Sequence, residues 1–266
     1  MRIMSQKIRE YVQTLLSEGR IKGFLGLKEE HGHILPHLFC DVRELEHMSL
    51  GDKGVPGDAR YPLNQLLIRL TREYPDAIFG VLVRGCDERG LRELFKWEQV
   101  KEEQVIPVGL GCPEELAKAC ECEKPFPDCL VDGPQGERVV GEKVASIDEM
   151  GLEARLEFWM TEFARCIKCF GCRNVCPMCF CNECSLEEES LIGTGEIPPD
   201  NPVFHLTRAV HMVGRCIDCG LCEEACPAGI PLRTLYKKVA EIVSEELDYR
   251  TGYTLEEKSP FNVIGG

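Results

Sequence analysis

The sequence lacks long apolar segments, an excess of basic charge and a recognisable leader. No apolar run approaches the roughly 20 residues that span a bilayer, so we expect no transmembrane segment. The net charge of −14 argues against nucleic-acid binding, because a phosphate-binding surface needs excess Lys and Arg. The first residues, MRIMSQKIREYVQTLL, contain no basic region followed by an apolar stretch, so they predict no secretory signal. These absences together predict a cytoplasmic protein.

Two kinds of catalytic or cofactor motif are also missing. No strand-to-helix turn carries the full G-x-G-x-x-G pattern of dinucleotide-binding folds, and Gly109-Leu110-Gly111 supplies only its first part. FAD therefore stays possible as a cofactor but is not favoured. The chain also shows no Ser-His-Asp arrangement and no motif with paired acids, so we predict no catalytic residues.

Cysteine, in contrast, is abundant, with 17 residues among 266, and much of it follows one repeated pattern. The pattern C-x2-C-x2-C-x3-C-P occurs once from Cys166 to Pro177 and again from Cys216 to Pro227. Two-cluster bacterial ferredoxins use this run to hold a pair of [4Fe-4S] clusters, and the fourth cysteine of each run binds the other cluster. The repeat predicts two such clusters and one-electron chemistry.

The spacing predicts how the eight cysteines divide. Three cysteines that follow one another at intervals of three wrap a loop around one cluster, and the extra residue and the proline then turn the chain away. We therefore predict cluster A on Cys166, Cys169, Cys172 and Cys226, and cluster B on Cys216, Cys219, Cys222 and Cys176.

Zinc and disulfide bonds explain this pattern less well. Structural zinc takes two pairs of ligands at C-x2-4-C spacing and has no use for three cysteines in a row followed by C-P. Disulfides need an oxidising compartment, and the sequence offers no sign of export.

Nine further cysteines lie outside the repeat. Cys40 and Cys129 are isolated in sequence and suit small buried side chains. Others follow predicted strands or crowd behind Cys176, where a third [4Fe-4S] cluster is possible because ligands bind at the carboxyl edge of parallel sheets. Its candidate ligands are Cys86, Cys112, Cys120, Cys122, Cys179, Cys181 and Cys184, and the sequence does not choose four among them.

We expect an α+β protein with two domains and a tail. Residues 1–150 alternate strand and helix, which predicts a small α/β domain for docking and for the possible third cluster. Residues 151–248 form the helix-flanked, bacterial-ferredoxin-like module with the two clusters, and residues 249–266 form an extended tail. Within these limits, strands are predicted over 21–27, 34–39, 77–83 and 105–108, and helices over 62–74, 91–95, 114–119, 203–213 and 232–247, with another helix starting near 152.

The two cysteine-rich runs resemble a known family. CIKCFGCRNVCPMCFCNEC and FHLTRAVHMVGRCIDCGLCEEACPAGIPL are similar to the dicluster iron–sulfur beta subunits of formate dehydrogenases and of deazaflavin-linked hydrogenases and dehydrogenases. The stretch LGDKGVPGDARYPLNQLLIRLTREYPDAIFGVLVRGCDERGLREL resembles the domain that precedes these runs in bacterial relatives. The resemblance implies an anaerobic hetero-oligomer whose beta subunit relays electrons between a catalytic subunit and a second redox protein, often a heterodisulfide-reductase-like flavoprotein.

Other functions stay open at this point. A self-contained flavin-dependent reductase would need its substrate site in the N-terminal domain, and a redox sensor would use cluster loss to alter binding. An electron carrier needs no catalytic constellation, which favours the relay. Loop charges add one expectation: Lys168 and Arg173 near cluster A, against Asp218 near cluster B, should make cluster A the more easily reduced.

Overall fold

The computed structural model describes residues 6–51, 60–188 and 201–262. The chain forms two compact units, Met1–Val140 and Gly141–Gly266. The first contains a mixed sheet with helices and the second is helical, so the predicted α+β class is confirmed. Within the described ranges, no helix combines the length and the apolar character that crossing a membrane requires.

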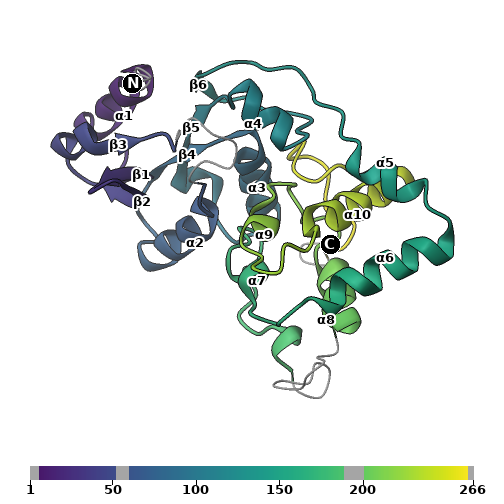
Figure 1. Ribbon diagram of the computed structural model, residues 1–266. Helices are drawn as coiled ribbons and strands as arrows, with labels where there is room; N and C mark the ends of the chain where they lie inside the picture. Colours follow the sequence, from purple (N-terminus) through teal and green to yellow (C-terminus); the bar gives the residue numbers. More distant parts are fainter. Residues whose placement is uncertain (1–5, 52–59, 189–200, 263–266) are drawn as a thin grey trace. The chain divides into compact units, whose positions relative to one another are not determined.

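The sheet of the first unit begins with an antiparallel hairpin and continues with parallel strands (Figure 1). The hairpin turns at His31 and Gly32, both with positive φ. The spatial order is β2-β1-β4-β5-β6, and β3 pairs with β1. The strands are β1 (Gly23–Glu30), β2 (His33–Phe39), β3 (Met48–Ser49), β4 (Phe79–Val83), β5 (Val105–Leu110) and β6 (Leu130–Asp132). The strands predicted over 21–27 and 34–39 thus form the antiparallel hairpin, and those predicted over 77–83 and 105–108 pair in parallel.

Four α-helices accompany this sheet, and two short 3-10 helices, η1 (Val42–His47) and η2 (Glu102–Gln104), precede β3 and β5. The α-helices are α1 (Gln6–Ser17), α2 (Leu63–Glu73), α3 (Gly85–Lys96) and α4 (Glu114–Ala119). Helices α2 and α3 contact each other and β4, whereas α1 contacts β1 and β6. Helix α1 buries Ile8, Val12 and Leu15, as its apolar spacing predicts.

Helix α3 begins earlier than the sequence predicts. A helix was predicted over 91–95, but Arg84 already serves as the N-cap and Gly85 begins the first turn. The Asp87 carboxylate accepts a hydrogen bond from the backbone N–H of Arg84 at 3.0 Å, which stabilises this start. Cys86 therefore lies on the helix, directly after β4.

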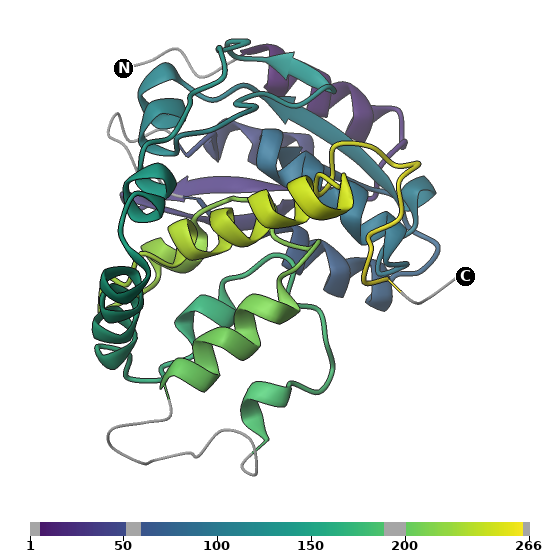
Figure 2. The ribbon, with the colours of Figure 1, turned by 90° about the vertical axis from the view of Figure 1, so that its right-hand side faces the viewer.

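The second unit consists of helices joined by loops, drawn in green to yellow in Figure 2. They are α5 (Lys143–Asp148), α6 (Leu152–Ala164), α7 (Gly171–Asn174), η3 (Ser185–Glu187), α8 (Asn201–His211), α9 (Leu221–Glu224) and α10 (Leu232–Leu247). Helix α10 contacts α5, α8 and α9, and α6 contacts α8. An ion pair of 2.6 Å between Lys238 and Asp148 joins α10 to α5 within this unit.

The C-terminal segment folds back onto the second unit where an extended tail was expected. Tyr249 and Ser259 are buried, and the Ser259 hydroxyl donates a hydrogen bond to the carbonyl oxygen of Gly214 at 3.3 Å. Gly214 has a φ of 63°, and a Cβ added there would lie 2.6 Å from the Ser259 Oγ. The tight approach of Ser259 to this glycine holds the segment in place. Most of the stretch between η3 and α8, residues 189–200, lies outside the described residues.

Candidate metal centre

The two cysteine loops follow the same backbone path. In each loop the second and fourth residues after the first cysteine adopt positive φ: Lys168 (49°) and Phe170 (58°) in one, Asp218 (52°) and Gly220 (79°) in the other. Each loop then enters a helix of four residues, α7 or α9. Non-glycine residues rarely adopt this conformation, so its recurrence at matching positions marks a shared structural requirement.

That requirement is the direction of backbone N–H groups. The N–H of Lys168 donates to the Cys166 sulfur at 3.4 Å, and the matching N–H of Asp218 donates to Cys216. A donor aimed at a sulfur stabilises the thiolate form over the thiol. Both loops thus present their first cysteine to a ligand with a backbone amide in support.

The two loops approach each other closely through α7 and α9. A Cβ added to Gly171 would lie 3.1 Å from the carbonyl oxygen of Ala225 and 3.5 Å from the Cys169 sulfur. Since Ala225 precedes Cys226, this contact brings Cys226 to the first loop. Burial raises the pKa of Cys166 and Cys172, and the charges of Cys226 and Cys169 contribute to both rises. The four cysteines of predicted set A are therefore neighbours.

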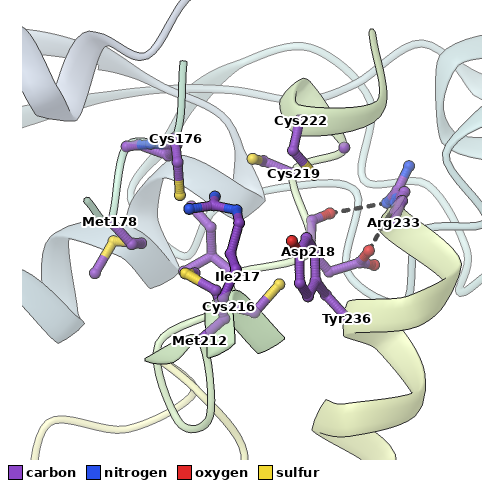
Figure 3. Close-up of a pocket in the computed structure, with 13 residues that line it drawn as sticks. Cys176, Met178, Met212, Cys216, Ile217, Asp218, Cys219, Cys222, Arg233 and Tyr236 are labelled. Carbon is purple, nitrogen blue, oxygen red and sulfur yellow. Dashed lines mark hydrogen bonds and ion pairs between the residues drawn. The ribbon is translucent and has the colours of Figure 1, made fainter. Parts of the chain in front are cut away.

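The four cysteines of predicted set B line one pocket, shown in Figure 3. Cys176 comes from the first loop and meets Cys216, Cys219 and Cys222 of the second. The rest of the lining is largely apolar and includes Met178, Met212 and Ile217. Burial raises the pKa of Cys216 to about 11 and that of Cys222 well above its usual range.

An ion pair closes one side of this pocket. The Asp218 carboxylate accepts from the Arg233 Nε at 2.6 Å, drawn as a dashed line in Figure 3, and lies 3.6 Å from the Lys237 Nζ. Arg208, only 3% exposed, and Tyr236, 2% exposed, also line the pocket.

The donor set fits an iron–sulfur cluster. Four sulfurs around one partly apolar pocket, with backbone amides behind them, are the surroundings in which thiolates hold [4Fe-4S] iron. Within residues 6–51, 60–188 and 201–262, no group of three or more His, Cys, Asp or Glu side chains is placed to hold a single metal ion.

The two histidines of α8 have separate, structural surroundings. His205 stacks on Phe163 with ring centroids 4.6 Å apart, and burial lowers its pKa to about 4. The His211 Nδ1 lies 3.4 Å from the Ser185 hydroxyl. His205 thus has a packing role, whereas His211 is exposed and lies beside a hydroxyl.

The candidate third-cluster cysteines are divided between the units. Cys86, Cys112, Cys120 and Cys122 belong to the first, where the last two add to the rise that burial causes in the pKa of Cys112. The Arg84 Nη1 donates to the Cys112 sulfur at 3.7 Å. Cys179, Cys181 and Cys184 belong to the second unit, so a third cluster stays a prediction. Cys40 is exposed and Cys129 half-buried, with its pKa raised to about 12 by burial and Glu88.

The polar and charged residues around the pocket could not be predicted from sequence patterns. Arg208 and Tyr236 sit on helices in positions that ordinary amphipathic patterns allow, and Arg233 is one cation among many. Only their packing against cysteines distinguishes them. A possible signal for Arg208 was its place one turn after Phe204, on the apolar side of its helix.

Comparison with known proteins agrees with this geometry and defines a class. Residues 209–231 match the family described as 4Fe-4S binding domain. The second unit thus contains a 4Fe-4S binding domain, which covers the run from Cys216 to Cys226.

Two relatives belong to the family that the cysteine-rich runs resemble. The chain is 42% identical over 108 residues to the F420-dependent formate dehydrogenase subunit beta of Methanocaldococcus jannaschii. These residues make up 41% of this chain and 28% of that protein. It is 43% identical over 111 residues to the F420-dependent formate dehydrogenase 1 subunit beta of Methanococcus maripaludis, covering 42% and 28%. The resemblance to formate dehydrogenase beta subunits is confirmed, although the matched part spans little more than a quarter of their length.

Proposed function

We propose that this chain is the iron–sulfur subunit of a cytoplasmic oxidoreductase of the formate dehydrogenase or hydrogenase type. In this role it relays single electrons between a catalytic subunit and a second redox carrier, such as a heterodisulfide-reductase-like flavoprotein. The observation that carries the proposal is the pair of four-cysteine sets, each completed by a cysteine from the opposite loop.

The ligand assignment follows the crossed sets. Cluster A is held by Cys166, Cys169, Cys172 and Cys226, and cluster B by Cys216, Cys219, Cys222 and Cys176. Each bound cluster supplies reversible one-electron transfer. The chain's own residues hold the thiolates, aim the amides of Lys168 and Asp218 at sulfur, and exclude water with Met178, Met212 and Ile217.

Two clusters held by interlocked loops suit a relay. Because each loop contributes to both sets, the two centres share one small unit and an electron can pass between them without motion of the chain. A catalytic subunit and an acceptor would then dock at different sides of that unit. No group on the described residues needs to touch a substrate for this function.

An apolar stripe on α6 supports attachment to a partner subunit. Leu152, Leu156 and Met160 follow one another at intervals of four and are 80%, 62% and 44% exposed. Such a row on a helix face is typical of an interaction surface. The relatives are named as subunits, and we propose that this stripe contacts the catalytic subunit.

The iron content tests the cofactor part of the proposal. Anaerobically purified protein should contain about eight iron and eight acid-labile sulfides per chain, and about twelve of each if the surplus cysteines hold a third cluster. Fewer than about six iron after full reconstitution, or zinc in their place, would contradict two clusters. Bound FAD in the fresh preparation would favour a self-contained reductase.

Co-purification tests the relay. Tagged chain isolated under anaerobic conditions from its own cells should bring a catalytic subunit with it. The doubly substituted Leu152→Glu, Leu156→Glu chain should retain its iron and lose most of that partner, whereas Val140→Glu, outside α6 and 75% exposed, should keep it. Robust oxidation of formate or hydrogen by the chain alone, with a dye as acceptor, would overturn the relay.

A further inference from the structure

Arg208 is a buried cation with no carboxylate partner. Its side chain is 3% exposed, and among the described residues no Asp or Glu forms an ion pair with it. Its Nε has no hydrogen-bond partner among them either. Burying an unpaired guanidinium is costly, so proteins place a compensating negative group nearby. The residues around Arg208 must supply that group.

The surroundings of Arg208 are cysteines and backbone. Its Nη2 donates to the carbonyl oxygen of Cys172 at 2.8 Å, and its Nη1 donates to the Cys179 sulfur at 3.3 Å. The guanidinium also lies 5.7 Å from the Tyr236 ring centroid. Neither hydrogen bond reaches a carboxylate, because one acceptor is a backbone carbonyl oxygen and the other is the sulfur of a cysteine outside both proposed ligand sets.

Arg208 also faces both proposed ligand sets. Cys172, whose carbonyl it binds, belongs to set A. The pocket that Arg208 lines is formed by all four cysteines of set B. The side chain thus lies at the boundary between the two sets, on α8, an element that contributes no ligand to either.

We propose that Arg208 is a positioning residue that supplies the shared countercharge of the two clusters and raises the reduction potential of both. This inference rests on the ligand sets proposed above. Four thiolates make each cluster site negative, and reduction adds a further negative charge. A fixed cation beside both sites favours the reduced states, and burial protects this interaction from screening by salt.

Replacement of the charge tests the proposal. In the full chain, reconstituted anaerobically, we expect Arg208→Met to shift the reduction equilibrium of both clusters toward the oxidised form by at least tenfold. A tenfold shift of a one-electron couple is about 59 mV. The measurement is an EPR-monitored redox titration in which both cluster signals are followed. Arg208→Lys, which keeps the charge, should shift either equilibrium less than threefold.

Arg173 offers a matched control. It directly follows the proposed ligand Cys172 and carries the same charge as Arg208, but its side chain is 23% exposed and paired with Glu187 at 2.7 Å. Arg173→Met should therefore change either equilibrium less than threefold. Unchanged potentials in Arg208→Met, a shift in one cluster only, or an equal shift in Arg208→Lys would each overturn the shared role.

Iron content separates this inference from the proposed function. If the wild-type chain holds fewer than about six iron, the two-cluster function itself fails. If the wild-type chain holds full iron and Arg208→Met does not, the iron content of Arg208→Lys becomes the deciding measurement. Full iron in Arg208→Lys supports the need for a positive charge, and low iron in Arg208→Lys overturns it.

Discussion

The loop from Cys166 to Cys176 and the loop from Cys216 to Cys226 turn at matching positions, yet the side chains around them differ. Both loops adopt positive φ twice and enter a helix of four residues. The backbone path follows from the need to place three sulfurs and several amides around one ligand. The side chains are free to differ, so they are where the two centres can be tuned apart.

The second positive-φ position shows this difference most clearly. Phe170 occupies it in the first loop and rests edge-on against Phe204, with centroids 5.5 Å apart at 88°. Gly220 occupies it in the second, where an added Cβ would lie 3.2 Å from Arg233. The first loop accepts backbone strain for an aromatic contact, and the second keeps the position clear for an arginine.

The charges around the loops also differ, but less than the sequence indicates. Arg173 is paired with Glu187, which weakens its effect on cluster A. Asp218 is paired with Arg233 and lies near Lys237, which offsets its charge near cluster B. Cluster A should still be reduced first, with a smaller difference than the unpaired charges imply.

The largest effect should come from breaking the crossed ligation. Cys176→Ser should remove cluster B and leave about four iron, since a cubane needs all four thiolates. The EPR signal that remains should match that of Cys219→Ser and differ from that of Cys169→Ser. Cys226→Ser should show the reverse. A Cys176→Ser signal that matches Cys169→Ser would contradict the crossed assignment.

Cys179 supplies the control for that experiment. It follows Cys176 by three residues, and the matching position of the second loop is Gly229. Cys179→Gly should retain about eight iron and both EPR signals, because Cys179 is not in either proposed ligand set.

Exchanging the residue type at the strained position should have the next largest effect. Gly220→Ala should lower the free energy of unfolding by about 1–2 kcal/mol, because it adds left-handed strain and displaces Arg233. Phe170→Gly should cost less, since lost packing is partly offset by relief of strain. The check is the urea midpoint of the anaerobic, cluster-loaded chain. A neutral Gly220→Ala would show that Arg233 moves aside freely.

A pH-dependent difference of about 1 kcal/mol in the free energy of unfolding should come from His205, which packs on Phe163 and Phe204. Its pKa is about 4 in the fold, against an ordinary value of 6.5. The folded protein therefore binds fewer protons, so this contribution is present above pH 6.5 and declines as the pH falls toward 4. Urea unfolding at pH 7.5 and 5.5 should show a smaller pH dependence in His205→Phe. An unchanged dependence would exclude His205 as its source.

The smallest effect should be on which of the two clusters has the higher reduction potential. Lys168→Glu should lower the potential of cluster A and Asp218→Lys should raise that of cluster B, each by tens of millivolts, because charges near a partly exposed site are screened. Redox titration followed by EPR measures both. Cluster B reducing first in the wild type, or no movement in either variant, would refute the charge argument.

The parts of the fold that could be predicted from the sequence are those with a local pattern of apolar residues, glycine or proline. The hairpin, α2 and α10 follow from alternation, from a proline at the first turn and from an apolar stripe. β6 and α5 were missed, since three and six residues are too few for a periodic signal. The contact of Ser259 with Gly214 could not be predicted, because it joins positions 45 apart.

The residues of the site also divide into those that the sequence predicts and those that it does not. The eight cysteines could be found because their spacing is itself the signature. Arg208 could not be predicted, because its importance comes from contacts with Cys172 and Cys179, 36 and 29 residues away. The surplus cysteines lie between these cases, since their crowding is visible and their partners are not.

The close approach of Gly171 to Ala225 has a consequence for how the two clusters would be inserted and lost. With the ligands crossed as proposed, each cluster acts as a bridge between the two loops, and the bridges run in opposite directions. Inserting one cluster positions the last cysteine of the other, so assembly should be cooperative. Damage should spread more slowly: oxygen that destroys one cluster loosens a ligand loop of its neighbour, so in air the second cluster should be lost faster once the first is gone, although it can persist alone under anaerobic conditions.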